Sequence, residues 1–305
     1  MRIYLIGLPG VGKSTTGKAL AEKLNYSFID VDKEIERAEK VSISYLFNHD
    51  GEEYFRNLET RAIRDIKEDD IVISLGGGIV EREENLKHLK GLVIYLKANL
   101  DYIKSRTSTK NRPLLKTYSL EELYSKRHEK YILFSNMTVE VEKSSEEIAD
   151  QIANLIFSGF KKLLVVSGPN LKNMDKRDPK VYGKQSYVGI IVRLRKEFRN
   201  IAFTFYQSNH EGAIIDKLEE YESFDGLLIN PGAYTHTSIA IRDCLEYIPI
   251  KKCEVHLSDI KNREDFRKVD YISPVVDKVF MGHGCDSYID AVNYIMASLK
   301  KEAEI

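Results

Sequence analysis

Several features that define other protein classes are rare or missing in this sequence. It has only three cysteines, Cys244, Cys253 and Cys285, and no CxxC pair, which argues against a disulfide framework or a zinc ribbon. No apolar run approaches the roughly 18 residues that span a bilayer, and the first residues lead straight into a glycine loop rather than a signal peptide. These absences favour a cytoplasmic protein with no membrane partner.

An excess of charge of either sign is also missing. The 46 Lys+Arg residues nearly balance the 47 Asp+Glu residues, and the net charge is -1, so a strongly basic nucleic-acid binder is not expected. Hydrophobic residues make up 43% and charged residues 30% of the chain, which excludes disorder as its main state. A length of 305 residues suits two domains of about 150 each.

Short apolar runs alternate with amphipathic stretches along the chain, which indicates α/β architecture with parallel sheets covered on both faces. We expect strands at Ile3–Ile6, Ser27–Ile29, Ile71–Ser74, Leu92–Leu96, Leu163–Ser167, Ile201–Tyr206, Gly226–Ile229 and Glu254–Leu257. We expect helices at Lys13–Leu24, Leu58–Ile66, Ser145–Phe157, Ile190–Phe198, Ala213–Tyr221 and Ile239–Leu245. Gly159 is a helix stop just before a new strand, so we place two domains at residues 1–159 and 160–305.

A phosphate-binding motif opens the first half. The run from Gly7 to Ser14 matches GxxxxGK[ST] between an expected strand and an expected helix, which is the context that this motif requires. Lys13 would reach the terminal phosphates and the Ser14 hydroxyl would bind Mg²⁺. The expected nucleotide contacts are Gly10, Val11, Gly12, Lys13, Ser14 and Thr15.

Two aspartates follow the next expected strand. Alternation along that strand would point Asp30 and Asp32 in different directions, one toward Mg²⁺ and the other toward the phosphate acceptor. The alternative interpretation of such a pair is a simple helix cap.

Three more motifs in the first half are hard to explain by packing alone: GEEYFR at Gly51–Arg56, LGGG at Leu75–Gly78 and RPLL at Arg112–Leu115. Glycines directly after a strand allow a ligand to approach the backbone closely. With the phosphate loop and the aspartate pair, these motifs make residues 1 to about 158 resemble shikimate kinase. The resemblance implies a P-loop NTPase-type parallel sheet with flanking helices, and phosphorylation of shikimate by ATP with Mg²⁺.

The same resemblance implies the roles of individual residues. Asp32 matches the aspartate that holds the substrate hydroxyls and acts as base, and Asp30 supports Mg²⁺ with Ser14. Arginine forks bind carboxylates bidentately, which suits Arg56 and Arg127 as holders of the shikimate carboxylate. The implied shikimate contacts are Asp32, Arg56, Gly77, Gly78 and Arg127.

A polar stretch between Arg106 and Arg112 resembles the kinase lid, and this resemblance implies that both arginines contact ATP. Its closure would bring Arg112 to the transferring phosphate and exclude water. Lys13, Mg²⁺ and Arg112 would then stabilise the charge of the transition state.

The second half has no cofactor fingerprint, but polar residues gather where three expected strands end. The clusters are Ser167–Asn170, Asn230–Ser238 and Glu254–Asp259, and ligands of open α/β sheets bind at such ends. Each residue could also have a purely structural role: His236 could cap a helix, and His256 could be a buried core histidine. Together with Arg177-Asp178-Pro179 and Tyr182-Gly183, the clusters make residues 161 to about 300 resemble type II 3-dehydroquinate dehydratase.

That resemblance implies a flavodoxin-like parallel α/β sandwich and an anti elimination of water through an enolate, without metal or cofactor. Tyr182 matches the base, and Arg177 matches the cation that favours its ionised form. Asn170 orients a water, His256 is the general acid, and Glu254 orients the His256 ring. The implied contacts of 3-dehydroquinate are Asn230, Gly232, His236, Asp243, Leu257, Ser258 and Arg267, with Asp243 reaching a neighbouring subunit of a dodecamer.

Three departures from the second family's pattern stand out. Residues 171–176 lack the usual Leu-Gly pair, Asp259 replaces an asparagine, and Ser287 stands where glycine is common. We interpret the chain as a bifunctional enzyme of aromatic biosynthesis. The alternatives are an active kinase with an inactive, oligomer-forming second domain, and a nucleotide-gated regulatory module.

Overall fold

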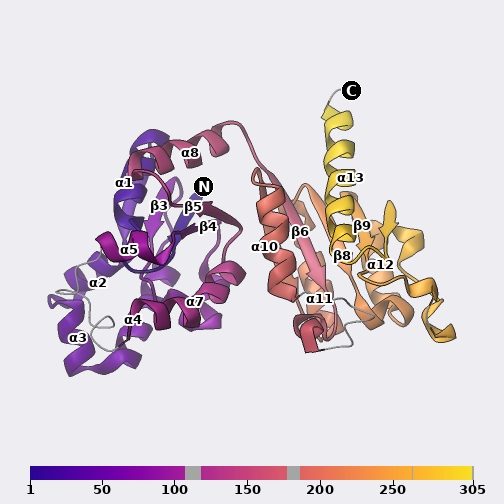
Figure 1. Cartoon of the computed structure of the whole chain (residues 1–305), viewed down its shortest axis with the longest axis horizontal. Coiled ribbons are helices and arrows are strands. Elements are labelled where there is room, and N and C mark those ends of the chain that lie inside the picture. Colours follow the sequence, from indigo (N-terminus) through magenta and orange to yellow (C-terminus); the bar gives the residue numbers. More distant parts are fainter. Residues whose placement is uncertain (107–117, 177–185, 263, 304–305) are drawn as a thin grey trace. The chain divides into compact units, whose positions relative to one another are not determined.

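The computed structural model describes residues 1–106, 118–176, 186–262 and 264–303, and it forms two compact units, Met1–Gly159 and Phe160–Ile305 (Figure 1). Each unit has one five-stranded sheet, and every strand pair is parallel. The predicted α/β class is therefore confirmed. All three cysteines are free thiols. Among the described helices, none combines the length and the apolar character that a membrane span requires.

The first unit orders its strands β2-β3-β1-β4-β5. The strands are β1 (Arg2–Ile6), β2 (Ser27–Asp30), β3 (Ile71–Ser74), β4 (Leu92–Lys97) and β5 (Met137–Glu140). The α-helices are α1 (Lys13–Leu24), α2 (Val31–Glu39), α3 (Ile43–His49), α4 (Gly51–Asp65), α5 (Leu100–Arg106), α7 (Leu120–Phe134) and α8 (Ser145–Phe157). Two short 3-10 helices, η1 (Ile79–Glu81) and η2 (Glu83–His88), follow the glycine run after β3.

The second unit orders its strands β10-β9-β8-β6-β7. The chain therefore starts in β6, beside the edge strand β7, and then continues through β8 and β9 to the opposite edge strand β10. The strands are β6 (Lys161–Ser167), β7 (Ile201–Gln207), β8 (Gly226–Asn230), β9 (Lys251–Val255) and β10 (Lys278–Phe280). The α-helices are α10 (Tyr187–Glu197), α11 (Glu211–Leu218), α12 (Ile239–Tyr247) and α13 (Asp286–Ala303). The 3-10 helices are η3 (Leu171–Lys176), η4 (Tyr221–Ser223), η5 (Gly232–His236), η6 (Ile260–Asn262), η7 (Asp265–Arg267) and η8 (Ser273–Val275).

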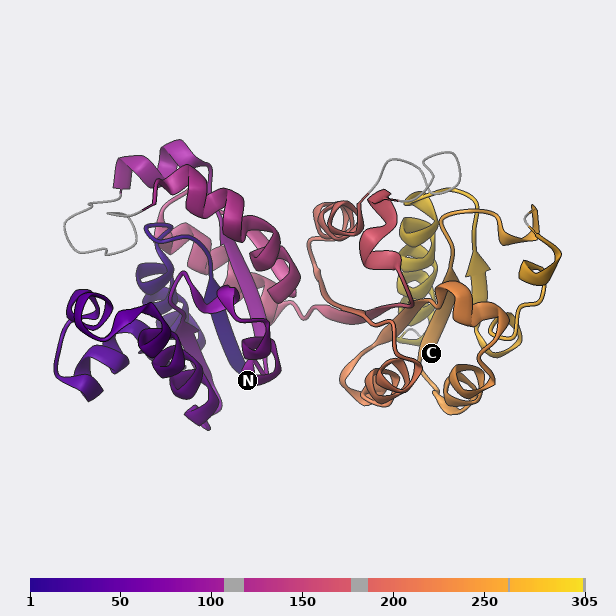
Figure 2. The same cartoon turned by 90° about the horizontal axis from the view of Figure 1, so that it is seen from below.

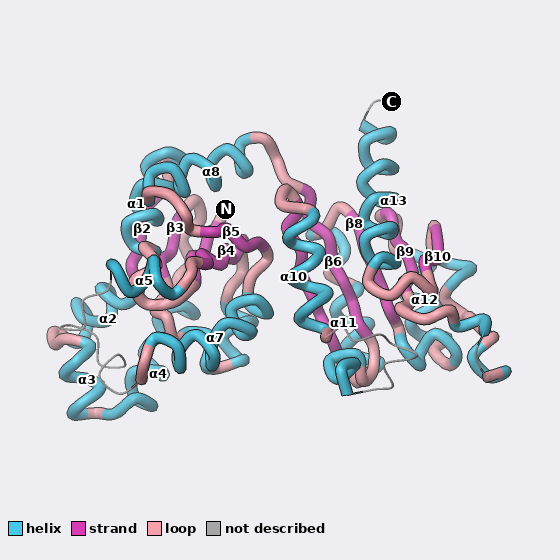
Figure 3. The backbone as a smooth tube through the Cα atoms, viewed as in Figure 1, coloured by secondary structure: helices cyan, strands magenta, loops and turns pink. Residues whose placement is uncertain are grey.

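Helices flank the sheet of the second unit on both faces, as Figures 2 and 3 show. One core joins alternate residues of β6 and β8 to α11 and α12. Its members include Leu164, Val166, Ile214, Leu227 and Ile241, all fully buried. Alternation sends the intervening strand residues to the other face, which explains why these strands are apolar without interruption.

Several predicted boundaries differ from the structure, and two of the differences involve site residues. Helix α4 begins at Gly51 rather than Leu58, because its first turns bury Arg56 and Glu59 and so lack the apolar stripe that marks a helix in sequence. Strand β9 covers Lys251–Val255 rather than Glu254–Leu257. Lys251, the first residue of β9, forms ion pairs with Asp277, just before β10, and with Glu302 of α13. His256 consequently lies just beyond the strand end.

The close approach of β6 and β8 at their carboxyl ends yields a test of the second unit. A Cβ on Gly168 would lie 2.0 Å from the carbonyl oxygen of Pro231, so Gly168→Ala is expected to cost about 1–3 kcal/mol of stability. Urea unfolding read by pulsed hydrogen exchange of peptides from residues 160–305 measures this. Gly212→Ala is the matched control, since a Cβ there meets nothing within 4 Å. Equal stability of the two variants would contradict the steric account.

Candidate active sites

The predicted phosphate loop connects β1 to α1 and is shaped by glycines. Gly10 (φ 92°) and Gly12 (φ 98°) have left-handed backbone conformations that other residues rarely adopt. Lys13 is buried at the start of α1, and its Nζ donates to the carbonyl oxygens of Gly7 at 2.9 Å and Leu8 at 3.1 Å. The loop therefore curls around a cation at a helix N-terminus, an arrangement that binds phosphate.

Two oxygen ligands predicted for Mg²⁺ lie at the carboxyl edge of the same sheet. Ser14 Oγ is 3.4 Å from Ser74 Oγ, at the end of β3. Asp30 ends β2, and its Oδ1 accepts a hydrogen bond from the backbone N of Lys33 at 3.3 Å. Asp30 thus does cap a helix. The expectation that strand alternation separates Asp30 from Asp32 is wrong, because residues two apart in a strand point to the same face. The two aspartates instead lie on different elements, since β2 ends at Asp30 and Asp32 lies in the first turn of α2.

Asp32 is a buried carboxylate in an unusual environment. Its Oδ1 is buried and has no hydrogen-bond partner among the described residues. A Cβ on Gly76 would lie 2.7 Å from Asp32 Oδ1 and 2.4 Å from Glu59 Oε1, so the glycine makes room for both carboxylates. Burial, and then the charge of Glu59, raise the pKa of Asp32 to about 7, while the charge of Lys13 opposes this shift. Near neutral pH this group can therefore accept or release a proton.

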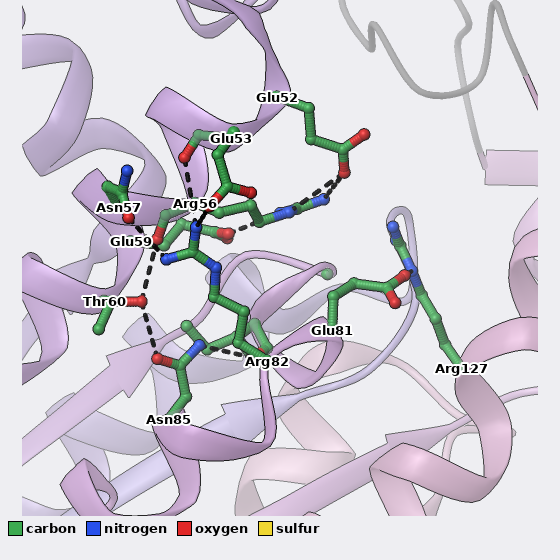
Figure 4. Close-up of polar contacts among 12 residues, drawn as sticks. Glu52, Glu53, Arg56, Asn57, Glu59, Thr60, Glu81, Arg82, Asn85 and Arg127 are labelled. Atoms are coloured by element: carbon green, nitrogen blue, oxygen red, sulfur yellow. Dashed lines mark hydrogen bonds and ion pairs between the residues drawn. The ribbon is translucent and has the colours of Figure 1, made fainter.

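Arg56 projects from α4 and lies between Glu52 and Glu59, as Figure 4 shows. Its Nη1 donates to Glu59 Oε2 at 2.5 Å, and Nε and Nη2 donate to Glu52 Oε1 at 3.2 and 2.7 Å. A Cβ on Gly78 would lie 2.0 Å from Arg56 Nη1, so only glycine fits beneath the guanidinium. Glu52 is 47% exposed, whereas Glu59 is fully buried. The outer carboxylate can therefore leave the guanidinium more easily than the inner one.

Arg127 reaches the same region from α7. Its side chain is 1% exposed, and Nε donates to Glu81 Oε1 at 2.8 Å, as drawn in Figure 4. The positive charges of Arg56 and Arg127 both act on Glu59, lowering a pKa that burial raises. Tyr131, one turn further along α7, donates a hydrogen bond to the Gly77 carbonyl. The structure thus brings both predicted arginines, Asp32, Lys13 and the glycine run together.

Parts of the first predicted site are not described. Arg112 lies outside the described residues, and so does the side chain of Arg106. Val11 is buried inside the loop, and Thr15 is exposed on the first turn of α1.

In the second unit, predicted residues meet where β6 and β8 end. Asn170 has a left-handed backbone (φ 65°), and its N–H donates to Asn209 Oδ1 at 2.9 Å. The side chain of Asn230 is buried, donating to the Tyr288 hydroxyl at 2.9 Å and accepting from the Gly232 N–H at 3.2 Å. This network fixes the amide of Asn230 at the edge of the sheet.

A buried carboxylate and a histidine lie where β9 ends. Glu254 is fully buried, and its Oε1 lies 2.9 Å from His256 Nε2 and accepts from Thr235 Oγ1 at 3.0 Å. Burial raises the pKa of Glu254, and the hydrogen bonds from His256 and Thr235 oppose that rise. Such a carboxylate fixes the orientation of its histidine ring.

The remaining predicted contacts make local interactions of their own. His236 Nδ1 is 2.6 Å from the Val269 carbonyl oxygen, and Arg267 donates to Glu264 within its own turn. Asp243 is 60% exposed on α12 and pairs with Arg242 rather than with the other predicted residues. Leu257 is buried and Ser258 is half-buried directly after His256. Arg177 and Tyr182 lie outside the described residues.

The three departures from the family pattern have local structural roles. Asp259 accepts hydrogen bonds from the Lys261 N–H and from Asn262 Nδ2, so its carboxylate caps its own turn. Ser287 is fully buried and accepts from the His283 N–H at 3.2 Å. Residues 171–176 form η3, with two side chains, Leu171 and Met174, buried.

Sequence reasoning missed three side chains that hold predicted ones in place: Glu59, Glu81 and Thr235. The three-residue spacing of Arg56 and Glu59 on one helix was an available signal. The other two contacts join segments far apart in sequence and left no local pattern.

The buried charge of Asp32 predicts a pH-dependent stability. Its folded pKa of about 7 exceeds the ordinary 3.8, so the folded state binds more protons between these values and stability falls as pH rises through them. Asp32→Asn is therefore expected to stabilise the first unit by at most about 4 kcal/mol at pH 8, and by less than about 2 kcal/mol at pH 5. Urea unfolding of peptides from residues 1–159 at both pH values measures this. The exposed control Asp65→Asn should show no such difference, and an Asp32→Asn effect of equal size at both pH values would refute it.

Both halves of the chain match known enzyme families. A shikimate kinase family model matches residues 9–157, and a class II dehydroquinase model matches residues 161–296. The 3-dehydroquinate dehydratase of Thermotoga neapolitana is 48% identical over 137 residues, covering 44% of this chain and 93% of that protein. The Thermotoga petrophila enzyme is 43% identical over 142 residues, covering 46% and 98%.

The first half has a solved relative. Shikimate kinase from Acinetobacter baumannii, in complex with shikimate, is 34% identical and covers 52% of this chain and 93% of that chain, with a TM-score of 0.50. The chain therefore belongs to two enzyme families, as a shikimate kinase in its first half and a type II dehydroquinase in its second.

Proposed function

We propose that this chain phosphorylates shikimate with ATP in residues 1–159 and dehydrates 3-dehydroquinate to 3-dehydroshikimate in residues 160–305. The observation that supports the kinase reaction is the group formed by Asp32 with the buried arginines Arg56 and Arg127 beside the phosphate loop. The observation that supports the dehydration is the buried pair of Glu254 and His256 at the end of β9.

The residues around the loop fit MgATP. The loop glycines and Lys13 would hold the phosphates, and Ser14 and Asp30 would supply oxygen ligands of the kind that Mg²⁺ prefers. The unpartnered Oδ1 of Asp32 is left for the substrate hydroxyl, since a buried carboxylate oxygen requires a donor. Mg²⁺ held by Ser14 and Asp30 would neutralise charge on the transferring phosphate.

Asp32 is the base of the proposed transfer. Its unpartnered oxygen accepts the proton of the shikimate hydroxyl that attacks the phosphate, and its pKa of about 7 suits exchange near neutral pH. Arg112 closes with the lid and stabilises the transferring phosphate. Positioning by the two arginines supplies the remaining rate enhancement.

Arg56 is engaged by two carboxylates before any substrate binds. Because Glu52 occupies its Nε and Nη2 edge, the shikimate carboxylate must displace Glu52 to reach that fork. Glu59 keeps its hold on Nη1, so the guanidinium stays in position while its outer partner is exchanged.

The second reaction is an elimination that uses no cofactor. Tyr182, ionised with the help of Arg177, removes the proton next to the carbonyl of 3-dehydroquinate, and Asn170 orients a water toward the enolate oxygen. His256 protonates the departing hydroxyl while Glu254 holds its ring. The contacts to the rest of the substrate come from Asn230, Gly232, His236, Leu257, Ser258 and Arg267.

A homo-oligomer completes the second site. Asp243 is 60% exposed on α12, where it is flanked by the exposed apolar side chains of Ile239 and Tyr247. An exposed carboxylate between apolar residues suits an interface between copies, at which Asp243 reaches the neighbour's substrate. The proposed assembly is the dodecamer of the second family.

The product of the dehydration is not the substrate of the kinase. The dehydration yields 3-dehydroshikimate, whose carbonyl must be reduced before the hydroxyl of shikimate exists. A reductase therefore acts between the two sites, and the fusion alone cannot pass its product from one to the other.

The separateness of the sites gives a direct test of the kinase. Lys13→Ala is expected to abolish shikimate-dependent ADP formation, since it removes the cation inside the phosphate loop. Dehydration by the same sample should stay within about twofold of the original, because that unit has its own core. Lys18→Ala, at an exposed position of α1, is the matched control. Loss of both activities in a folded Lys13→Ala protein would defeat the two-site proposal.

The dehydratase site is tested through Glu254. Glu254→Gln keeps the shape of the side chain but removes the charge beside His256, so kcat for 3-dehydroquinate should fall about 10²-fold while KM changes much less. Thr235→Val removes one donor to the carboxylate and should have a smaller effect in the same direction. The exposed control Glu222→Gln should leave kcat and KM for 3-dehydroquinate unchanged. An unaffected kcat in Glu254→Gln would remove His256 as the acid.

A further inference from the structure

Glu81 lies outside the residues assigned above and is surrounded by three cations. It ends η1, directly after the glycine run, and faces α7. Its Oε1 accepts from Arg127 Nε at 2.8 Å and lies 3.7 Å from Lys126 Nζ, and its Oε2 accepts from Lys130 Nζ at 2.9 Å. Burial acts to raise the pKa of Glu81, but the hydrogen bonds from Arg127 and Lys130 outweigh it and lower the pKa to about 2. Glu81 is therefore ionised at any pH at which the enzyme works.

One guanidinium nitrogen of Arg127 is left without a partner. Glu81 accepts from Nε, and the Tyr131 hydroxyl is a further side-chain hydrogen-bond partner of Arg127, whereas Nη1 is buried and has no hydrogen-bond partner among the described residues. A guanidinium nitrogen buried in this way is costly unless a ligand completes it. Figure 4 shows the guanidinium of Arg127 beside Glu81, with Glu52 and Arg56 in the same region.

The two arginines of the site thus differ in how many of their guanidinium nitrogens already have a partner. On Arg56, the Nε, Nη1 and Nη2 nitrogens all donate to carboxylates, so binding there requires an exchange of partners. Arg127 retains an unpartnered nitrogen next to one that a carboxylate fixes. The first hydrogen bond to an incoming carboxylate is therefore available at Arg127.

We propose that Glu81 is a positioning residue that fixes the guanidinium plane of Arg127 for the substrate carboxylate, and that Lys126 and Lys130 offset its charge. This rests on the proposed binding of shikimate. Without the lysines, Glu81 would cancel the charge of Arg127 and weaken attraction for an anion; with them, the cluster of one carboxylate and three cations has a net charge of +2. Glu81 thus orients Arg127 while the site stays attractive to a carboxylate.

Glu81→Gln tests this proposal. Glutamine keeps the size of the side chain but loses the charge that holds Nε, so Arg127 can turn toward Glu59, on which its charge already acts. The KM for shikimate should rise about tenfold, while kcat and the KM for MgATP stay within about twofold. Glu81→Asp should restore part of the affinity, and the exposed Glu84→Gln is the matched control.

A double-mutant cycle with Arg127→Met shows whether Glu81 acts through that arginine. In the Arg127→Met background, Glu81→Gln should change the KM for shikimate by less than about twofold. An effect as large as in the original background would overturn the proposal, and so would a lowered KM, which would make Glu81 a competitor of the substrate. A joint fall in kcat and in MgATP affinity, with faster hydrogen exchange in residues 1–159, would reduce Glu81 to a structural role. Dehydration by the same samples gives the concentration of intact protein.

Calorimetric binding of shikimate separates this proposal from the kinase assignment. A chain that binds shikimate tightly without phosphorylating it, with affinity that depends on Glu81 through Arg127, would remove the kinase reaction and leave the positioning role. A chain that does not bind shikimate would remove both.

Discussion

The buried arginines of the first site are each held by a carboxylate, and the geometry of that site depends on these pairs. A guanidinium buried alone is costly, so Arg56 with Glu59, and Arg127 with Glu81, can be buried only as pairs. Each pair uses part of the guanidinium fork and thereby fixes how the rest is oriented. Asp32 differs from these paired charges because its pKa is about 7, and it is the group to which we assign the proton transfer.

Both units use the same architectural solution for different chemistry. In each, parallel strands end along one edge of the sheet, and turns at that edge bring polar groups together. Glycines at that edge remove side chains where two groups must approach closely, as Gly78 does beneath Arg56 and Gly168 does against Pro231. The first unit fills the edge with phosphate-binding backbone and arginines, and the second fills it with amides, a histidine and a buried glutamate.

Joining two such units in one chain does not join their reactions. Each unit has its own sheet and core, and the proposed product of one differs from the proposed substrate of the other by a reduction. What the covalent link guarantees is an equal number of the two sites. It also makes each activity an internal reference for the other, because both come from the same folded chain.

The sequence by itself determined the features that depend on local pattern. These are the α/β class, the phosphate loop from Gly7 to Ser14, and the glycine run after β3. Each is fixed by neighbouring residues, since glycine conformations and strand periodicity do not require distant contacts. Only the tertiary structure decided which partners hold the site residues: Arg127 meets Glu81 across 46 residues, and Thr235 meets Glu254 across 19. The pKa of Asp32 likewise depends on burial and on Glu59, because the free energy of a charge is set by what folding places around it rather than by its neighbours in sequence.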